Sequence, residues 1–215
     1  MREPLVVDWD GTVTEVDGLH LVLSEFGDVD VYEQAEERLG RSLTLHEVIA
    51  FEFETVRAPL ADVVAWVRAN VRIRAGFADL ARRHRPLVVS SGFRELIDPV
   101  LERDGLELEV RANRLDARPD GWRAIFRNAE ACSVCGEACK RSDVTGLGDF
   151  VYVGDGFSDR CVAQAATRVF ARDGLAEYLD ERRVPYELYD DFYDVRDALG
   201  GAAVVPPGRS RGRKT

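Results

Sequence analysis

Short apolar runs alternate with stretches of helical periodicity along most of the chain. Runs at 5–7, 86–89, 150–153, 167–171 and 186–189 have the length and apolar character of buried strands, and amphipathic segments lie between them. Strands that alternate with helices are typical of a parallel sheet covered by helices on both faces. We therefore predict a Rossmann-like α/β fold with a parallel sheet flanked by helices.

The first strand is followed by a purely helical stretch. Four helical patterns succeed one another within residues 15–73, and the third begins with Thr44 and Glu47, whose spacing is that of a capping box. We predict that this stretch is a small all-helical cap, inserted after the first strand and packed over the mouth of the sheet. The α/β core then consists of residues 1–14 and 74–205. Such a cap excludes water from a reaction site.

Three further segments carry a distinct pattern. Residues 106–115 and 122–126 alternate around an Asp-Gly turn and predict a β-hairpin flap, and a helix is expected to begin at Lys140. The segment 206–215 is rich in Gly, Ser and Pro, and we predict that it is a disordered basic tail. Its basic residues are Arg209, Arg211, Arg213 and Lys214.

Composition narrows the classes of function. The 215 residues carry a net charge of −10, which disfavours a polyanionic partner such as nucleic acid. The hydrophobic content of 46% is ordinary for a globular protein, and no apolar run reaches the length of a membrane span. The start of the sequence lacks the layout of a signal peptide, so we expect a cytoplasmic protein without membrane or nucleic-acid partners.

Two acids follow the first strand directly. Asp8 and Asp10 come after Leu5–Val7, and Gly11 lets the backbone turn. Carboxylates this close repel one another unless a proton or a cation lies between them, and Mg²⁺ is the natural resident of an oxygen-rich site. The stretch also begins like a calcium-binding EF-hand loop, but the later positions of that loop lack the required acids and glycine. A plain strand–turn with solvated acids remains the simple alternative.

Other polar residues stand at the ends of later strands or, in the case of Lys140, at the start of a predicted helix. If the strands are parallel, these residues meet the first two acids at one edge of the sheet. A carboxylate nucleophile, a metal held by carboxylates, a lysine and a hydroxyl together suit a phosphoryl group, whose transfer depends on positioning and charge stabilisation. The residues concerned are Asp8, Asp10, Ser90, Lys140, Asp155 and Asp159.

These motifs have the order and spacing of a known superfamily. Asp8–Thr14, Ser90, Lys140 and Gly154–Asp159 resemble the four motifs of the haloacid dehalogenase (HAD) superfamily, and the helical insert resembles its first type of cap. Within that superfamily the chain is similar to the phosphatases of methionine salvage and to the phosphoserine phosphatase-like group. The narrower resemblance lies at 74–77, 139–140, 170–173 and 191–193.

The resemblance implies a HAD-type fold and a role for each motif residue. Asp8 would be the nucleophile and a Mg²⁺ ligand, and Asp10 the general acid and base whose backbone carbonyl also binds Mg²⁺. Asp155 would be the next metal ligand, and Asp159 would support it or Lys140. Lys140 would neutralise the charge of nucleophile and phosphate. Phosphate oxygens would be held by Gly11, Ser90, Ser91, Gly92 and Lys140.

The sequence holds a dense group of cysteines. Cys132, Cys135 and Cys139 are spaced for a possible zinc site, with Cys161 or a neighbouring acid as the fourth ligand. A redox pair between the first two cysteines is another interpretation. The third is reduced thiols that pack beside Lys140 in a cytosolic protein.

Three residues of the cap are candidates for substrate contact. Asp17 lies where related caps keep an acid that reaches the substrate, although a helix N-cap is an equally good interpretation. His46 and Arg57 are weaker candidates, because either side chain fits a packed or solvated position as well.

The function that follows is a Mg²⁺-dependent phosphomonoesterase acting on a small phosphorylated metabolite through an aspartyl-phosphate. The resemblance implies 2-hydroxy-3-keto-5-methylthiopentenyl-1-phosphate as the substrate, with phosphoserine as the alternative. A hypothesis of another class is a non-catalytic, zinc-stapled interaction protein that has kept the fold.

Overall fold

The computed structural model describes residues 3–200, so the predicted basic tail at 206–215 and the last residues of the predicted core lie outside the described residues. The described residues form one seven-stranded sheet in the order β4-β3-β2-β1-β5-β6-β7. Neighbouring strands run parallel, except for β3 and β4. The strands are β1 (Leu5–Val7), β2 (Leu87–Phe93), β3 (Val110–Asp116), β4 (Arg123–Ile125), β5 (Val151–Gly154), β6 (Arg168–Ala171) and β7 (Glu187–Leu188).

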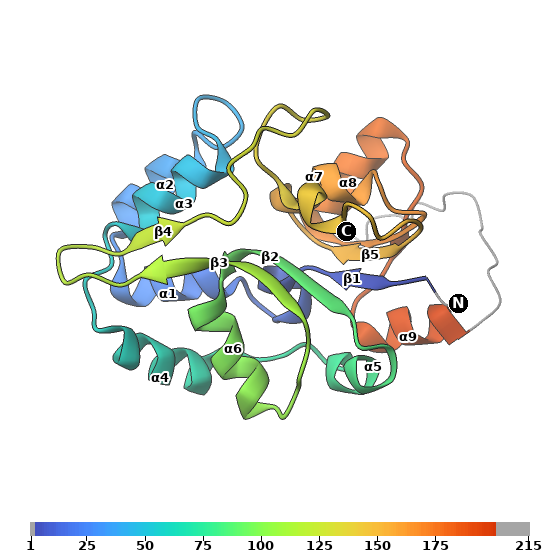
Figure 1. Cartoon of the computed structure of the whole chain (residues 1–215), viewed down its shortest axis with the longest axis horizontal. Helices are drawn as coiled ribbons and strands as arrows, with labels where there is room; N and C mark the ends of the chain where they lie inside the picture. The colour runs from blue at the N-terminus through green and yellow to red at the C-terminus, as the bar shows by residue number, and fades with distance from the viewer. Residues whose placement is uncertain (1–2, 201–215) are drawn as a thin grey trace, which may run out of the picture.

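Helices cover both faces of the sheet, as predicted, so the α/β fold is confirmed. In Figure 1, α5, α6 and α9 lie below the sheet, and α7 and α8 lie above it. Side chains of the central strand alternate between the two layers, because successive residues of a strand point to opposite faces. Leu5 and Val7 join the larger core, and Val6 joins the smaller one under α7 and α8. These helices are α5 (Phe77–His84), α6 (Arg94–Arg103), α7 (Arg160–Ala163), α8 (Asp173–Arg182) and α9 (Phe192–Gly200).

Residues between β1 and α5 form a group of helices at one end of the sheet (Figure 1). The predicted capping box is present, since the Glu47 amide donates to the Thr44 hydroxyl at 3.3 Å and the Thr44 amide to the Glu47 carboxylate at 2.8 Å. The chain enters and leaves this group side by side, with Thr14 bridged to Ile73. The helices are α1 (Gly18–Phe26), α2 (Val29–Glu36), α3 (Leu45–Phe53) and α4 (Leu60–Asn70).

Two predicted elements differ from the structure. The segment expected to form a separate hairpin flap is part of the main sheet: β3 pairs with β2 in parallel, and β4 forms an antiparallel edge. Fully buried Trp122 explains this placement, because its indole Nε1 donates to the Ala58 carbonyl of the cap at 3.0 Å and ties the hairpin down. The helix expected from Lys140 is a short 3₁₀ turn that ends at Val144. Gly146 and Gly148, both at positive φ, follow it and turn the chain away.

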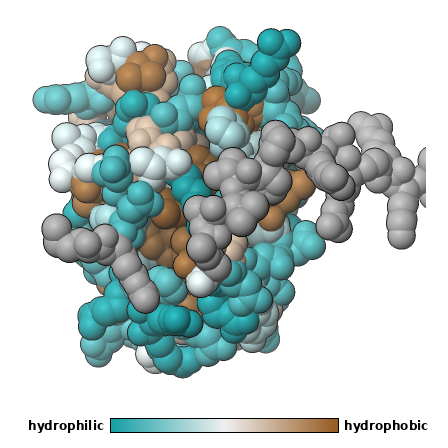
Figure 2. All heavy atoms as spheres, turned by 90° about the vertical axis from the view of Figure 1, so that its right-hand side faces the viewer, coloured by the Kyte–Doolittle hydropathy of each residue, from teal (hydrophilic) through white to brown (hydrophobic). Residues whose placement is uncertain are grey.

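The surface is mixed in character. On the face that lies to the right in Figure 1, Figure 2 shows hydrophilic residues over most of the lower half and hydrophobic residues near the middle. Among the described residues, no helix has both the length and the apolar character that a membrane crossing requires.

Candidate active site

The candidate site lies where the order of the sheet reverses. The chain starts at β1, builds outward through β2 and β3 on one side, and then continues through β5, β6 and β7 on the other side. In open α/β sheets, the crevice at the carboxyl ends of the two strands at such a switch point is the usual place for a ligand. Asp8 follows β1 and Asp155 follows β5, so the topology itself brings these two acids together.

A buried lysine joins two of the acids. The Lys140 ammonium donates to Asp8 Oδ1 at 2.5 Å and to Asp159 Oδ1 at 2.7 Å, and all three side chains are buried. Asp159 also accepts from the Tyr152 hydroxyl at 2.6 Å. Its other oxygen accepts from the backbone amide of Asp155 at 2.9 Å. Asp159 is thus fully engaged, and it fixes Lys140 against Asp8.

Asp155 completes a group of carboxylates. One oxygen each from Asp8, Asp155 and Asp159 lies within 4.8 Å of the others. Asp155 Oδ1 accepts from the Thr12 hydroxyl at 2.5 Å. Gly11 is at φ +76°, and a Cβ built on it would meet the Asp155 carboxylate at 2.4 Å, so this turn requires glycine. Lys140 is the cation that contacts the group, and it leaves part of the negative charge unbalanced.

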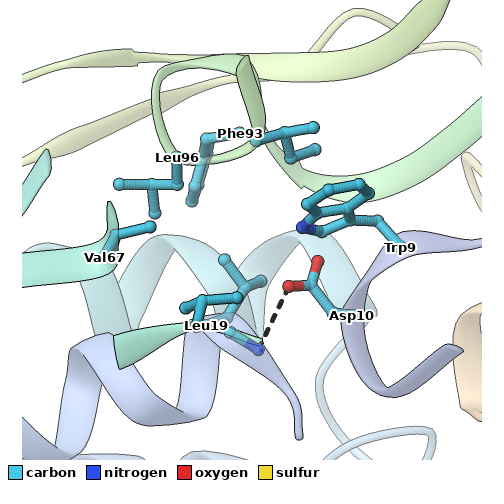
Figure 3. A pocket seen from close by; sticks show the side chains of 9 residues that line it. Trp9, Asp10, Leu19, Val67, Phe93 and Leu96 are labelled. Carbon is cyan, nitrogen blue, oxygen red and sulfur yellow. Dashed lines mark hydrogen bonds between the residues drawn. The ribbon is translucent and has the colours of Figure 1, made fainter. Parts of the chain in front are cut away.

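Asp10 points elsewhere although it is only two residues from Asp8. Its Oδ1 accepts from the Gly18 amide at 3.2 Å and its Oδ2 from the Ser90 hydroxyl at 3.2 Å. Figure 3 shows the carboxylate beside a small pocket whose labelled residues are Trp9, Leu19, Val67, Phe93 and Leu96. The pocket has a volume of about 10 Å³, room for about one water molecule. Asp10 therefore faces the junction between cap and core rather than the carboxylate group.

These surroundings give the four acids different pKa values. Burial, together with Asp17, raises the pKa of Asp10 to about 8. Burial and the nearby Asp159 raise the pKa of Asp8, and they raise the pKa of Asp155 to about 7. Burial opposes ionisation of Asp159, but Lys140 and the backbone amide of Gly156 hold its pKa below the usual value. Acids with separated pKa values are able to take different roles in acid and base chemistry.

Two hydroxyls follow each other at the end of β2. Ser90 is fully buried, where its Oγ accepts from the Gly92 amide at 2.8 Å while it donates to Asp10. Ser91 is half-buried and lines the neighbouring cavity, and its carbonyl accepts from Asn113 Nδ2 at 2.8 Å. The doublet therefore offers one hydroxyl to Asp10 and the other to the cavity.

No role was predicted from the sequence for Arg74, which the structure connects to the first motif. Its guanidinium donates to the carbonyl oxygens of Gly11 at 2.7 Å, Thr12 at 2.9 Å, Thr14 at 3.0 Å and Glu15 at 3.2 Å. The clamp holds the loop that carries Asp10. The sequence did mark this residue, because Arg74 is the first residue of one of the segments of the narrower resemblance. Spacing alone does not reveal which carbonyl oxygens an arginine side chain reaches.

A cavity of about 480 Å³ lies between cap and core, and Lys140 and Ser91 border it. His46 of the cap lines it as well, and its ring stacks on Phe126 at a centroid distance of 3.9 Å. Burial and the nearby Arg127 lower the pKa of His46, so its ring tends to be neutral. Of the three cap residues expected to contact substrate, His46 is the one that faces this cavity.

The other two cap candidates take different positions. Asp17 is exposed and serves as the N-cap of α1, since its Oδ1 accepts from the amides of Leu19 at 2.8 Å and His20 at 3.0 Å. Asp17 therefore forms the helix N-cap that the sequence also allowed, and its Oδ1 is engaged there. Arg57 is exposed and lines another groove, bounded by Phe26 and Phe51 of the cap helices. Arg57 is not among the described residues that line the cavity beside Lys140.

The cysteines come together beside the site. Cys132, Cys135, Cys139 and Cys161 each offer a sulfur within 4.8 Å of the others, and all four are free thiols. Cys161 belongs to α7, whereas the other three precede Lys140 in the chain.

The family follows from the comparison with known proteins. The model of the haloacid dehalogenase-like hydrolases matches residues 5–164, which include all four motifs and the whole helical insert. The chain therefore belongs to the haloacid dehalogenase-like hydrolase family.

Individual relatives give finer detail. The chain is 27% identical over 213 residues to a 2-hydroxy-3-keto-5-methylthiopentenyl-1-phosphate phosphatase of Geobacillus kaustophilus (strain HTA426), covering 94% of this chain and 97% of the relative. It is also 27% identical over 208 residues to a phosphatase of the same name from Microcystis aeruginosa, covering 93% and 98%. Among solved structures, the phosphoserine phosphatase of T. onnurineus superposes with a TM-score of 0.67 at 16% identity, covering 93% of this chain and 94% of that one. At that identity the structural likeness concerns the fold.

Proposed function

We propose that the protein is a Mg²⁺-dependent phosphomonoesterase and that Asp8 is its nucleophile. The observation that carries the proposal is the contact of Lys140 Nζ with Asp8 Oδ1 at 2.5 Å, beside Asp155 and apart from Asp10. This arrangement separates an acid paired with a lysine from a second acid whose pKa is raised to about 8. One acid is then able to attack phosphorus while the other acts as a proton donor.

The donor set suits a hard divalent cation. Asp8 and Asp155 offer carboxylate oxygens, burial and neighbouring acids raise the pKa of both, and a single lysine offsets their charge. We propose that Asp8, Asp155 and the backbone carbonyl of Asp10 would hold Mg²⁺, with Asp159 supporting them from its bonds to Lys140 and the Asp155 amide. When bound, the cation would supply charge stabilisation to the phosphoryl group.

The chain's own residues account for the rest of the reaction. Asp8 attacks phosphorus and forms an aspartyl-phosphate, while Lys140 balances the charge that gathers on the two groups. Protonated Asp10 gives its proton to the leaving alkoxide and then takes a proton from the water that attacks the aspartyl-phosphate. The hydroxyl of Ser90 or Ser91 and the amides of Gly11, Ser91 and Gly92 are the proposed donors to the phosphate oxygens. Residues 15–73 act as the cap.

For the substrate, we propose 2-hydroxy-3-keto-5-methylthiopentenyl-1-phosphate. Support comes from the names of relatives that match nearly their whole length. The cavity beside Lys140 is also of suitable character, because it is lined by the apolar residues Leu45, Val134 and Phe157 together with Lys140 and Ser91. A small metabolite with a charged phosphate and an apolar methylthio end needs both kinds of lining.

Phosphate release from a panel of phosphorylated metabolites, including phosphoserine and an aryl phosphate, tests the proposal. We expect kcat/KM to be highest for the methylthio compound, activity to require Mg²⁺, and Asp8→Asn to lower kcat by at least about 10³-fold. Glu25→Gln, an exposed change on α1, is the matched control and should leave kcat unchanged. Activity that survives Asp8→Asn, or that persists in chelator, would refute the mechanism. A preference for phosphoserine would refute the substrate.

A further inference from the structure

The four cysteines beside Lys140 have the spacing of a mononuclear metal site. Four sulfurs bound to one zinc ion at about 2.3 Å stand about 3.8 Å apart at the corners of a tetrahedron. Here the Cys132 and Cys161 sulfurs are 3.9 Å apart, and all four lie within 4.8 Å of one another. A disulfide needs about 2.05 Å between its sulfurs. In iron–sulfur clusters, several metal and sulfide ions separate the thiolates further.

The local backbone forms a tight turn around the first two cysteines and directs an amide at the Cys132 sulfur. The turn from Cys132 to Gly136 is closed by the Gly136 amide, which donates to the Cys132 carbonyl at 2.8 Å, and Gly136 is at φ +81°. The Val134 amide donates to the Cys132 sulfur at 3.4 Å. Amides that point at sulfur stabilise a metal-bound thiolate and fix its direction. This Cys-x-x-Cys-Gly turn therefore supplies two of the four sulfurs from one short segment.

The other half comes from two segments that carry the active-site cation and its partner. Cys139 directly precedes Lys140, and Cys161 follows Asp159 by two residues. Between β4 and Lys140, residues 126–139 contain no helix or strand, so hydrogen bonds of regular structure do not hold this described stretch in place. A metal ion that binds all four sulfurs would tie the stretch to α7.

We propose that Cys132, Cys135, Cys139 and Cys161 bind one structural Zn²⁺ as a tetrathiolate, and that this ion tethers residues 126–139 to α7. Soft thiolate ligands in tetrahedral geometry select zinc over Mg²⁺, so the site is chemically distinct from the carboxylate group at Asp8 and Asp155. The cysteines serve the fold here, and the ion takes no part in the reaction. Its effect is to hold the backbone on both sides of the Lys140–Asp159 ion pair.

Metal content gives the first test. Protein purified under reducing conditions and dialysed should hold about one zinc per chain by elemental analysis, and Cys132→Ser or Cys161→Ser should remove most of it. Ser133→Ala, an exposed change within the same turn, is the matched control and should keep the metal. Asp8→Asn should also keep it, because that variant alters the carboxylate group alone. Zinc retained in Cys161→Ser, iron in place of zinc, or an oxidised cysteine pair without metal would overturn the assignment.

Cobalt and hydrogen exchange provide the second test. Reduced, zinc-free protein titrated with Co²⁺ should develop the absorption of a tetrahedral thiolate complex and reach its end point at about one equivalent. Amides of residues 126–144 should exchange at least about 10-fold more slowly with zinc than without it, while the amides of α5 on the opposite layer should not change. No cobalt spectrum would overturn the site, and unchanged exchange at 126–144 would overturn the tether.

Discussion

Buried acids occur in both the core and the cap, and the two regions treat them differently. Asp8 in the core and Glu52 on α3 of the cap are equally buried, each 4% exposed. Asp8 is paired with Lys140 at 2.5 Å, whereas Glu52 Oε1 has no hydrogen-bond partner among the described residues. Burial, with Glu36 and Asp17 nearby, raises the pKa of Glu52 to about 8. Burial of an acid is thus not itself a sign of a site. What distinguishes Asp8 from Glu52 is the lysine in contact with its carboxylate.

Removal of that cation should have the largest effect. In Lys140→Met, Asp8 and Asp159 remain buried without their partner, and we expect a loss of about 3–5 kcal/mol of unfolding free energy at pH 7. The loss should shrink at low pH, where both acids become protonated. Chemical denaturation measures it, and Arg83→Met, an exposed cation on α5, is the control. If Lys140→Met is as stable as that control, the core does not depend on its charge pairing.

Asp10 sharpens the contrast within the core, because its partly buried carboxylate accepts from an amide and a hydroxyl rather than from a cation. We expect Asp10→Asn to lower kcat by about 10²–10⁴-fold, the usual contribution of a general acid and base. In the wild type, the protonated form of Asp10 is the proton donor, so activity should fall as pH rises through about 8. The pH profile of kcat/KM checks this. A wild-type profile that is flat from pH 6 to 10 would contradict the role.

The smallest effect is expected in the cap. A carboxyl with a raised pKa in the folded state supports folding fully below its unfolded pKa of about 4.5, and this support is lost as pH rises through about 8. Glu52→Gln removes the charge, so the variant should be more stable than wild type by about 1–3 kcal/mol at pH 8 and similar at pH 4. Thermal unfolding at both pH values, with exposed Glu25→Gln as control, measures the difference. An equal gain in stability at pH 4 and pH 8 would show that the charge of Glu52 does not destabilise the cap.

The sequence was most informative where chemistry coincides with the end of a strand. Asp8 and Asp155 lie at the switch point of the sheet, because parallel strands bring their carboxyl ends to one edge and the order of strands follows from short connections. Lys140 is 132 residues away from Asp8. No periodicity links them, so their meeting was predicted only on the condition that the strands are parallel, and the resemblance to the family motifs supported it.

The sequence was least informative about irregular segments and long side chains. The four guanidinium contacts of Arg74 depend on where four carbonyls point in a tight loop, which no pattern of residue types encodes. Cys161 was named only as one possible fourth ligand of the cysteine group, because its separation in sequence from the other three does not predict whether it lies near them. The hairpin was predicted but its docking was not, because the tie between Trp122 and the cap is a tertiary contact.

The clamp of Arg74 has a consequence for turnover. One guanidinium donates to the carbonyls of Gly11 and Thr12 in the loop that follows Asp8, and also to that of Glu15, where the chain enters the helical insert. The segment that returns from the helical insert is hydrogen-bonded to the segment that enters it, since the Glu15 amide donates to the Arg72 carbonyl at 3.0 Å. If the proposed cap moves to admit a substrate, its pivot would have to lie beyond these contacts. The groups around Asp8 would then keep their alignment as the entrance widens, and each turnover would begin without rebuilding the loop.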